Sequence, residues 1–431
     1  MRRKSKLRFF GVPALLLPLI VACSAAVQSQ PATTPEAMPT PEVTATPAAE
    51  ATPTPQATPP ATVTPTTAPS LDQADPPEFQ IELRQANINT SGWETDFSQR
   101  SVPYAEFISG GPPKDGIPSI DDPKFISVVE ADQWLADTEP VQMVDIDGDA
   151  RAYPLQILIW HEIVNDVIGD RPIAVTYCPL CNTALVFDAT LPDGRSLDFG
   201  VSGKLRFSDL VMFDRQTESW WQQATGEAIV GELTGTSLEF IPSPILSWAE
   251  FKAARPDGKV LSRDTGFSRS YGENPYAGYD SGQPWLFRGP EDDRLRATER
   301  VATVSLGNQD VAFPFSVLEQ EPVVHYQAGD TDIVVFHQKG TASALDSGLI
   351  AKGRDVGSTG VFIPEVNGQS RTFEMRDGQF RDRETGSTWN LLGEAVAGPS
   401  QGEKLEPVVH GNHFWFSWAV FQPDTIVYRG G

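Results

Sequence analysis

Residues 173–188 read IAVTYCPLCNTALVFD and contain Cys178 and Cys181, the only cysteines of the chain beyond Cys23. A run of β-branched and aromatic residues enters the Cys-Pro-Leu-Cys turn and a second apolar run leaves it, which predicts two buried strands joined at a bend. Two thiols three positions apart can close a disulfide, bind a soft metal ion or supply a reactive thiolate. This turn is therefore the candidate functional site of the chain.

The sequence just before this stretch offers a histidine as a partner for the thiols. Residues 161–168 are predicted to form a hairpin with the strand that ends at Cys178, which would bring His161 close to that thiol. A histidine within hydrogen-bond reach would lower the pKa of Cys178, with Glu162 or Asn165 fixing the imidazole tautomer. The alternative is that His161 is an ordinary hydrogen-bonded residue at the end of a strand.

Three uses of the two thiols can be compared. A thioredoxin-type site opens a long helix, whereas a Pro-Asp-Gly turn at residues 192–194 follows soon after this motif, so that fold does not match, and thiol–disulfide chemistry on another scaffold stays open. Covalent haem attachment needs CxxCH, and Asn182 excludes it. A mixed Cys/His site for Zn or Cu(I) would need further ligands from other parts of the chain. The candidates are His161, His337, His410 and His413. The remaining alternative is a structural disulfide.

The body of the chain contains the same series of phrases twice. Residues 144–158, VDIDGDARAYPLQIL, resemble residues 304–318, VSLGNQDVAFPFSVL, and DRQTES at 214–219 returns as DRETGS at 382–387. We therefore predict two tandem copies of one unit, at residues 141–263 and 301–429, joined by a connection at 264–300. Each copy is rich in short β-branched and aromatic runs between Gly, Asp and Pro turns. The predicted fold class is a β-rich α+β fold, with the copies packed about a pseudo-twofold axis.

The two copies differ at the cysteine motif. Aligning the sequences places His337 opposite Cys178 and Gly340 opposite Cys181, so only the first copy has the thiols. This asymmetry predicts one working site per chain. Short helices are expected at residues 155–159 and 245–254, the second capped by Ser243.

The segment before the first copy, residues 76–140, contains the loop GGPPKDGIP at 110–118. A Gly/Pro-rich run of this kind is expected to lie against the body. Lys114 and Asp115 could reach the thiol site from there and take part in its chemistry. The alternative is a surface loop with a solvated ion pair.

The beginning of the chain predicts export. Five basic residues precede an apolar run that is too short for a membrane span and that ends in small residues before Cys23, as in a bacterial lipoprotein signal peptide covering residues 1–22. The resemblance implies that Cys23 carries lipid and anchors the chain to the cell membrane outside the cytoplasm. An ordinary secretory signal with a chance cysteine is the alternative. The Pro-, Thr- and Ala-rich residues 23–75 are predicted to form a disordered stalk.

The charge of the chain limits its partners. It has 33 Lys and Arg against 57 Asp and Glu, a net charge of −24, and removal of the five basic residues of the signal peptide would leave −24 − 5 = −29. A surface this acidic argues against nucleic acid as a partner and against electrostatic binding to anionic lipids. A small-molecule or protein partner is not specified by the sequence.

Several long phrases make the chain similar to a known family. They are GGPPKDGIPSIDDPKF, RAYPLQILIWHEIVND, VTYCPLCNTALVF, SDLVMFDRQTESWWQ and RDRETGSTWNLLG, spread from about residue 107 to 429. In these phrases the chain resembles domain-of-unknown-function family 3179, which comprises exported or membrane-associated bacterial and archaeal proteins. The resemblance implies no established activity.

The sequence thus favours thiol redox or soft-metal chemistry, with Cu or Zn as the possible metal. Cys178 would be the reactive thiolate, Cys181 the resolving thiol or second ligand, and His161 the base or third ligand. The competing hypothesis is a non-enzymatic cell-surface binding or structural module in which Cys178 and Cys181 form a disulfide.

Overall fold

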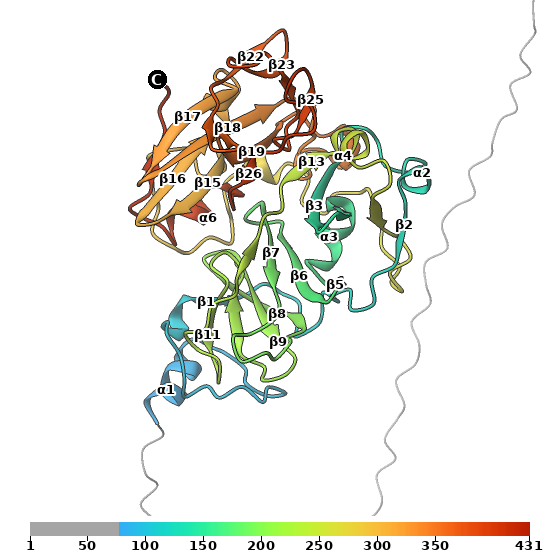
Figure 1. The fold of residues 1–431 in the computed structure, drawn as a ribbon. Helices are drawn as coiled ribbons and strands as arrows, with labels where there is room; N and C mark the ends of the chain where they lie inside the picture. The colour runs from blue at the N-terminus through green and yellow to red at the C-terminus, as the bar shows by residue number, and fades with distance from the viewer. Residues whose placement is uncertain (1–76) are drawn as a thin grey trace, which may run out of the picture. The chain divides into compact units, whose positions relative to one another are not determined.

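Strands make up most of the regular structure in residues 77–431, the part of the chain that the computed structural model describes (Figure 1). The predicted β-rich α+β class is confirmed. The predicted signal peptide, the lipid site at Cys23 and the stalk lie outside the described residues. None of the helices within residues 77–431 has the length and apolar character that a membrane crossing requires.

Three sheets form the first half of the described chain. The first has the order β1 (Phe107–Ser109), β8 (Phe199–Arg206), β9 (Asp209–Asp214), β10 (Trp220–Gln222) and β11 (Glu227–Val230). The second is β12 (Phe240–Ile241), β7 (Thr183–Asp188), β6 (Arg171–Cys178) and β5 (Ile163–Ile168). The third is β13 (Ile245–Ser247), β3 (Pro140–Ile146), β4 (Asp149–Pro154), β14 (Lys259–Leu261) and β2 (Phe125–Ser127).

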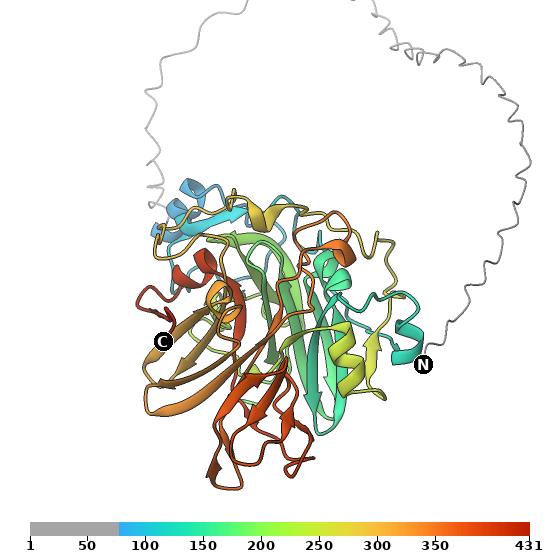
Figure 2. The same ribbon diagram turned by 90° about the horizontal axis from the view of Figure 1, so that it is seen from above.

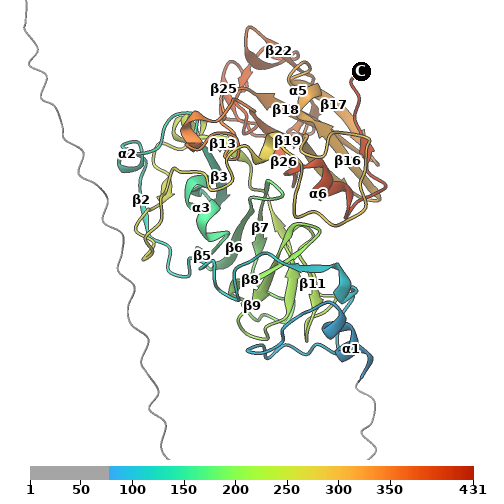
Figure 3. The same ribbon diagram turned by 180° about the vertical axis from the view of Figure 1, so that it is seen from behind.

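The second half contains three four-stranded sheets and one small hairpin. The sheets are β22 (Phe373–Arg376), β23 (Gln379–Asp382), β24 (Thr388–Trp389) and β25 (Ala395–Ala397); β17 (Val323–Ala328), β18 (Thr331–Gln338), β19 (Ser358–Ile363) and β26 (Glu406–Pro407); and β27 (Gly411–Phe414), β15 (Arg300–Leu306), β16 (Gln309–Pro314) and β28 (Ile426–Val427). The hairpin pairs β20 (Glu365–Val366) with β21 (Gln369–Ser370). Figures 1 and 3 show β22, β23 and β25 at one end of the molecule, and β1 and β11 at the other.

Six α-helices and three 3-10 turns complete the described residues. They are α1 (Glu78–Gln85), α2 (Val128–Ala131), α3 (Leu155–His161), α4 (Trp248–Ala254), α5 (Phe315–Leu318), α6 (Trp415–Ala419), η1 (Tyr104–Glu106), η2 (Tyr279–Ser281) and η3 (Ile350–Lys352). The helix predicted at 155–159 is confirmed as α3. The predicted Ser243 cap is wrong: residues 245–247 are strand β13, paired with β3, and α4 begins after Ser247, which forms a capping box with Glu250.

The sheets of the two halves have corresponding strand orders. In the first half β14 runs parallel to β4, and in the second β28 runs parallel to β16. A local bond also recurs: Trp221 Nε1 donates to Asp214 at 2.9 Å, and Trp389 Nε1 donates to Asp382 at 2.8 Å. The relation of the halves by a pseudo-twofold axis stays a prediction.

Residues 264–299 form an irregular segment between the halves, here called the strap. Its only helical turn is η2, and Figure 2 shows it in yellow to gold beside the green strands of the first half. Asp280 of η2 is fully buried and accepts hydrogen bonds from Arg300 at 3.1 Å, Ser343 at 2.6 Å and Arg354 at 2.9 Å. These contacts fasten the strap to the second half.

Candidate functional site

The Cys-Pro-Leu-Cys turn joins β6 to β7 and is buried by both halves of the chain. Cys178 is 2% exposed and Cys181 is 0% exposed, and both are free thiols. The Cys181 N–H donates to the Cys178 carbonyl at 3.2 Å, which closes the turn. From the second half, Phe414 N donates to the Cys181 carbonyl at 2.9 Å and Ser417 Oγ donates to it at 3.2 Å. The backbone that carries the thiols is therefore held from outside the turn as well as from within.

The tip of the β8–β9 hairpin faces the thiols. Its two turn residues, Phe207 and Ser208, have φ of 54° and 67°, the left-handed conformation of a tight hairpin turn that usually favours Asn and Gly. The Ser208 carbonyl accepts from the Cys178 thiol at 3.7 Å and from the Cys181 thiol at 3.4 Å. A strained turn with non-glycine residues at such a place is a feature of functional sites.

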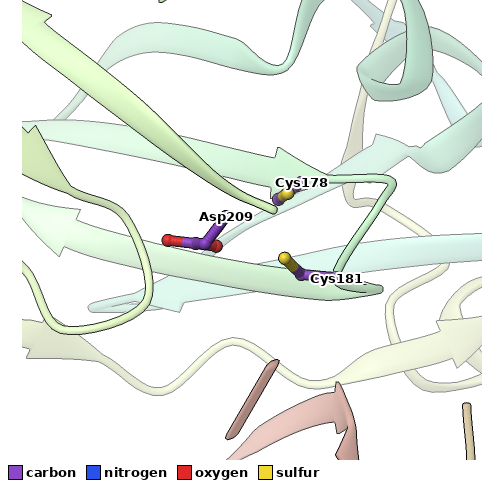
Figure 4. Close-up of side chains that lie close together, drawn as sticks. All are labelled: Cys178, Cys181 and Asp209. Atoms are coloured by element: carbon purple, nitrogen blue, oxygen red, sulfur yellow. The ribbon is translucent and has the colours of Figure 1, made fainter. Parts of the chain in front are cut away.

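Asp209, the residue after this turn, completes a cluster with the two thiols (Figure 4). It is fully buried, and one ligand atom from each of Cys178, Cys181 and Asp209 lies within 4.8 Å of the others. Asp209 Oδ2 accepts from Ala224 N at 2.9 Å and from the side chain of Gln222. Asp209 Oδ1 is buried and has no hydrogen-bond partner within residues 77–431. One carboxylate oxygen is thus left for a ligand.

The site contains four acidic groups and no paired cation. Burial raises the pKa of Asp209 to about 6, and burial together with the Asp209 charge raises the pKa of Glu162 to about 8. Burial also raises the pKa of both thiols. Within the described part of the chain, no salt bridge involves Asp209 or Glu162. Four buried groups that can each become negative suit a bound cation, because it would compensate their charge.

The predicted contact between His161 and Cys178 is wrong. The hairpin forms as predicted, with β5 and β6 joined at Gly169 and Asp170, but both nitrogens of His161 are engaged elsewhere. Nδ1 contacts the Pro118 carbonyl and Nε2 contacts the Tyr271 hydroxyl, each at 2.7 Å. The physical reason is the end of α3, where Glu162 takes a positive φ of 60° and turns the chain. Glu162, predicted only to orient the histidine, is the acid whose charge is coupled to Asp209.

Lys114 and Asp115 do not meet the thiols. The loop lies against the body as expected, because Asp115 N donates to the Val201 carbonyl at 2.9 Å. Lys114 pairs with Glu218 and lies 4.5 Å from the centre of the Trp93 ring. Asp115 accepts from Arg215 at 3.1 Å and 3.2 Å. Both side chains therefore join the loop to the turn at residues 214–219, and the prediction that they act at the thiol site is wrong.

The histidines of the second half also lie apart from the thiols. His337 contacts the Val356 carbonyl, and His410 contacts the carbonyls of Val408 and Thr359. His413 Nδ1 lies 2.8 Å from the Thr183 hydroxyl, next to the turn but not at its sulfurs. The third protein ligand for a metal is instead Asp209. Sequence reasoning missed it because no motif marks this acid, which follows a hairpin turn far along the chain.

Glu162→Gln tests whether this carboxyl is held uncharged in the native protein. A native pKa of about 8 against an ordinary 4.5 means that the native state keeps the proton while the unfolded chain loses it, so stability falls as pH rises from 4.5 to 8. In the metal-free protein, the glutamine variant should be more stable than wild type by about 3 kcal/mol at pH 7, with no such gain at pH 4.5. Urea unfolding at both pH values measures this. The exposed Glu239→Gln is the control, and a pH-independent difference would contradict the prediction.

The comparisons with known proteins add a family. A family model described as "Protein of unknown function (DUF3179)" matches residues 114–425. No curated protein and no solved structure matches the chain.

Proposed function

The chain belongs to the DUF3179 family of proteins of unknown function, and from its own geometry we propose that Cys178, Cys181 and Asp209 bind one zinc-class metal ion. The observation that carries the proposal is the cluster itself: two sulfurs and a carboxylate oxygen lie within 4.8 Å of one another, and the other oxygen atom of that carboxyl pairs with protein donors. Atoms at such separations can share one ion.

The mixed donor set selects among metals. Thiolates favour soft and borderline ions, and Zn²⁺ accepts Cys and Asp together in a tetrahedral site. Cu(I) would be held by the two thiols alone and would leave the carboxylate unused. Zn²⁺ is therefore the best match, and its fourth position falls to Glu162 or to a water molecule.

Metal content and Co²⁺ uptake test the proposal. The purified full chain should carry close to one zinc per molecule, and after chelation it should bind Co²⁺ with the intense near-ultraviolet charge-transfer band of thiolate ligation. Because thiols must lose their protons to bind, uptake should weaken as pH falls. A chain with both thiols reduced that takes up neither ion at neutral pH would overturn the proposal.

Thiol–disulfide exchange is a second candidate, favoured by the carboxyl of Asp209 beside Cys181. The Cys178 thiolate would attack a partner disulfide and form a mixed disulfide while one partner thiolate leaves. Cys181 would pass its proton to Asp209, attack Cys178 and release the partner as a dithiol, leaving a Cys178–Cys181 disulfide. Thiol trapping in redox buffers distinguishes the cases. A pair that reacts with a partner disulfide but binds no metal supports exchange, and a pair that stays oxidised supports the structural-disulfide alternative.

The location of the protein is also a proposal. The basic and apolar residues 1–22 followed by Cys23 support an exported lipoprotein whose body is held outside the cytoplasm on a stalk. Labelling of the wild type but not of Cys23→Ala with a radioactive fatty acid would support it, and equal labelling would contradict it.

A duplicated unit is likewise proposed. The corresponding strand orders and the repeated Trp–Asp bond support it. Superposition of the equivalent strands should need a rotation near 180°, and a rotation far from that value would remove the pseudo-twofold axis.

A further inference from the structure

A groove separate from the thiol cluster lies between the two halves and has a volume of about 590 Å³. We call it the His413 groove. One wall comes from the first half, with Leu185 of β7 and Phe240 of β12, and the other from the second half, with Val409, His413 and Trp418. Its size is that of pockets that hold small organic molecules.

His413 gives the groove a built polar group. The side chain lines the groove although it is only 2% exposed. Its Nδ1 is held by the Thr183 hydroxyl at 2.8 Å, whereas Nε2 has no hydrogen-bond partner among residues 77–431. Gly411 makes room for it, because a Cβ at that position would lie 2.1 Å from Nε2. The ring is thus positioned from one side and left with a free nitrogen.

The charge of the groove excludes most ionic ligands. Its lining contains no lysine and no arginine, and Glu239 lies exposed at its rim. Burial lowers the pKa of His413 to about 3, so its imidazole is neutral at ordinary pH. An anion would therefore find no positive partner here.

The walls favour a flat apolar ring. The Trp418 ring centre lies 5.2 Å from that of His413 with an angle of 34° between the planes. Leu185 and Phe240 add apolar surface on the opposite half. An aromatic ligand can pack against such rings, and a single hydroxyl can pair with one free imidazole nitrogen.

We propose that the His413 groove binds an uncharged aromatic alcohol, with its ring beside Trp418 and its hydroxyl bonded to His413 Nε2. This site uses none of the residues assigned to the metal, so the proposal stands or falls independently of the metal site.

The test uses 2-naphthol as the probe and calorimetric titration of the full chain. Naphthalene, which lacks the hydroxyl, and 2-naphthoate, which is an anion, are the comparison ligands. We expect 2-naphthol to bind, naphthalene to bind about five- to tenfold more weakly for want of one hydrogen bond, and naphthoate to bind weakest. Absence of 2-naphthol binding, or a preference for naphthoate, would overturn the proposal.

Two variants locate the binding. Val409→Trp should fill the groove from a position that is 38% exposed and weaken 2-naphthol binding at least tenfold. Val396→Trp, on β25 and 48% exposed, is the matched control outside the groove lining and should bind like wild type. His413→Phe should remove the advantage of 2-naphthol over naphthalene. Equal binding by the two tryptophan variants would overturn the proposal even if the His413 variant fails to fold.

Discussion

Replacing Cys181 with serine is expected to weaken Zn²⁺ binding about a hundredfold or more. Structural zinc sites supply roughly 10–16 kcal/mol through four ligands, which is about 3 kcal/mol for each ligand, and each 1.4 kcal/mol is a factor of ten. Cys181 is fully buried and belongs to the cluster with Cys178 and Asp209, so no solvent ligand can easily replace its sulfur. Asp209→Asn should weaken binding as well, because an amide oxygen is a poorer ligand than a carboxylate.

Competition with a coloured chelator measures these affinities, and thermal unfolding gives a second readout. Zn²⁺ should raise the unfolding midpoint of wild type, since a ligand that binds only the native state stabilises it, and should not raise that of Cys181→Ser. Cys23→Ser is the matched control, because it removes the third cysteine of the chain and leaves the cluster intact. Equal zinc affinity in wild type and Cys181→Ser would contradict the assignment of this sulfur as a ligand.

Local patterns predicted the surroundings of the thiols well. The apolar runs around Cys178 and Cys181 became strands β6 and β7, and the hairpin before them has its two-residue turn at Gly169 and Asp170. These features depend on neighbouring residues and on alternation along a strand, which a sequence displays directly. The β-rich class follows from the same patterns.

The third member of the cluster could not be predicted in this way. Asp209 lies 209 − 181 = 28 residues after Cys181 and reaches it only because the β8–β9 hairpin folds back over the turn. No local pattern encodes that contact. His161 failed for the opposite reason: it is near in sequence, but the positive φ of Glu162 turns the chain at the end of α3.

The comparison of the halves also had an error of one residue. Sequence alignment set His337 opposite Cys178, an offset of 337 − 178 = 159. The hairpins pair Ile168 with Arg171 and Ala328 with Thr331, an offset of 331 − 171 = 160, which sets Gln338 opposite Cys178. Because side chains alternate along a strand, one residue changes the face of the sheet, so His337 is not the counterpart of the thiol.

The strap should control access to the thiols, and Asp280→Asn tests this. Ionised Cys178 and Cys181 raise the pKa of Tyr279, which places this buried strap residue close to both sulfurs. Asp280 follows it directly and is the carboxylate that pairs with Arg300, a residue only 7% exposed. Removing that charge leaves the Arg300 guanidinium buried without its partner, a change that costs about 3–5 kcal/mol.

We therefore expect Asp280→Asn to lower the free energy of unfolding by about 3 kcal/mol or more, and to raise the rate at which Ellman's reagent modifies the thiols of the metal-free chain about a hundredfold. The rate rises because a buried thiol reacts only from opened states, whose population grows tenfold for each 1.4 kcal/mol. The Cys23→Ser background removes the signal of the third cysteine. Asp264→Asn is the control in the same strap, because its side chain is 69% exposed and its pair with Lys124 should contribute less than about 1 kcal/mol. If the two variants modify at the same rate, the pairing of Asp280 does not hold the strap over the thiols, and the cluster must be reached by another route.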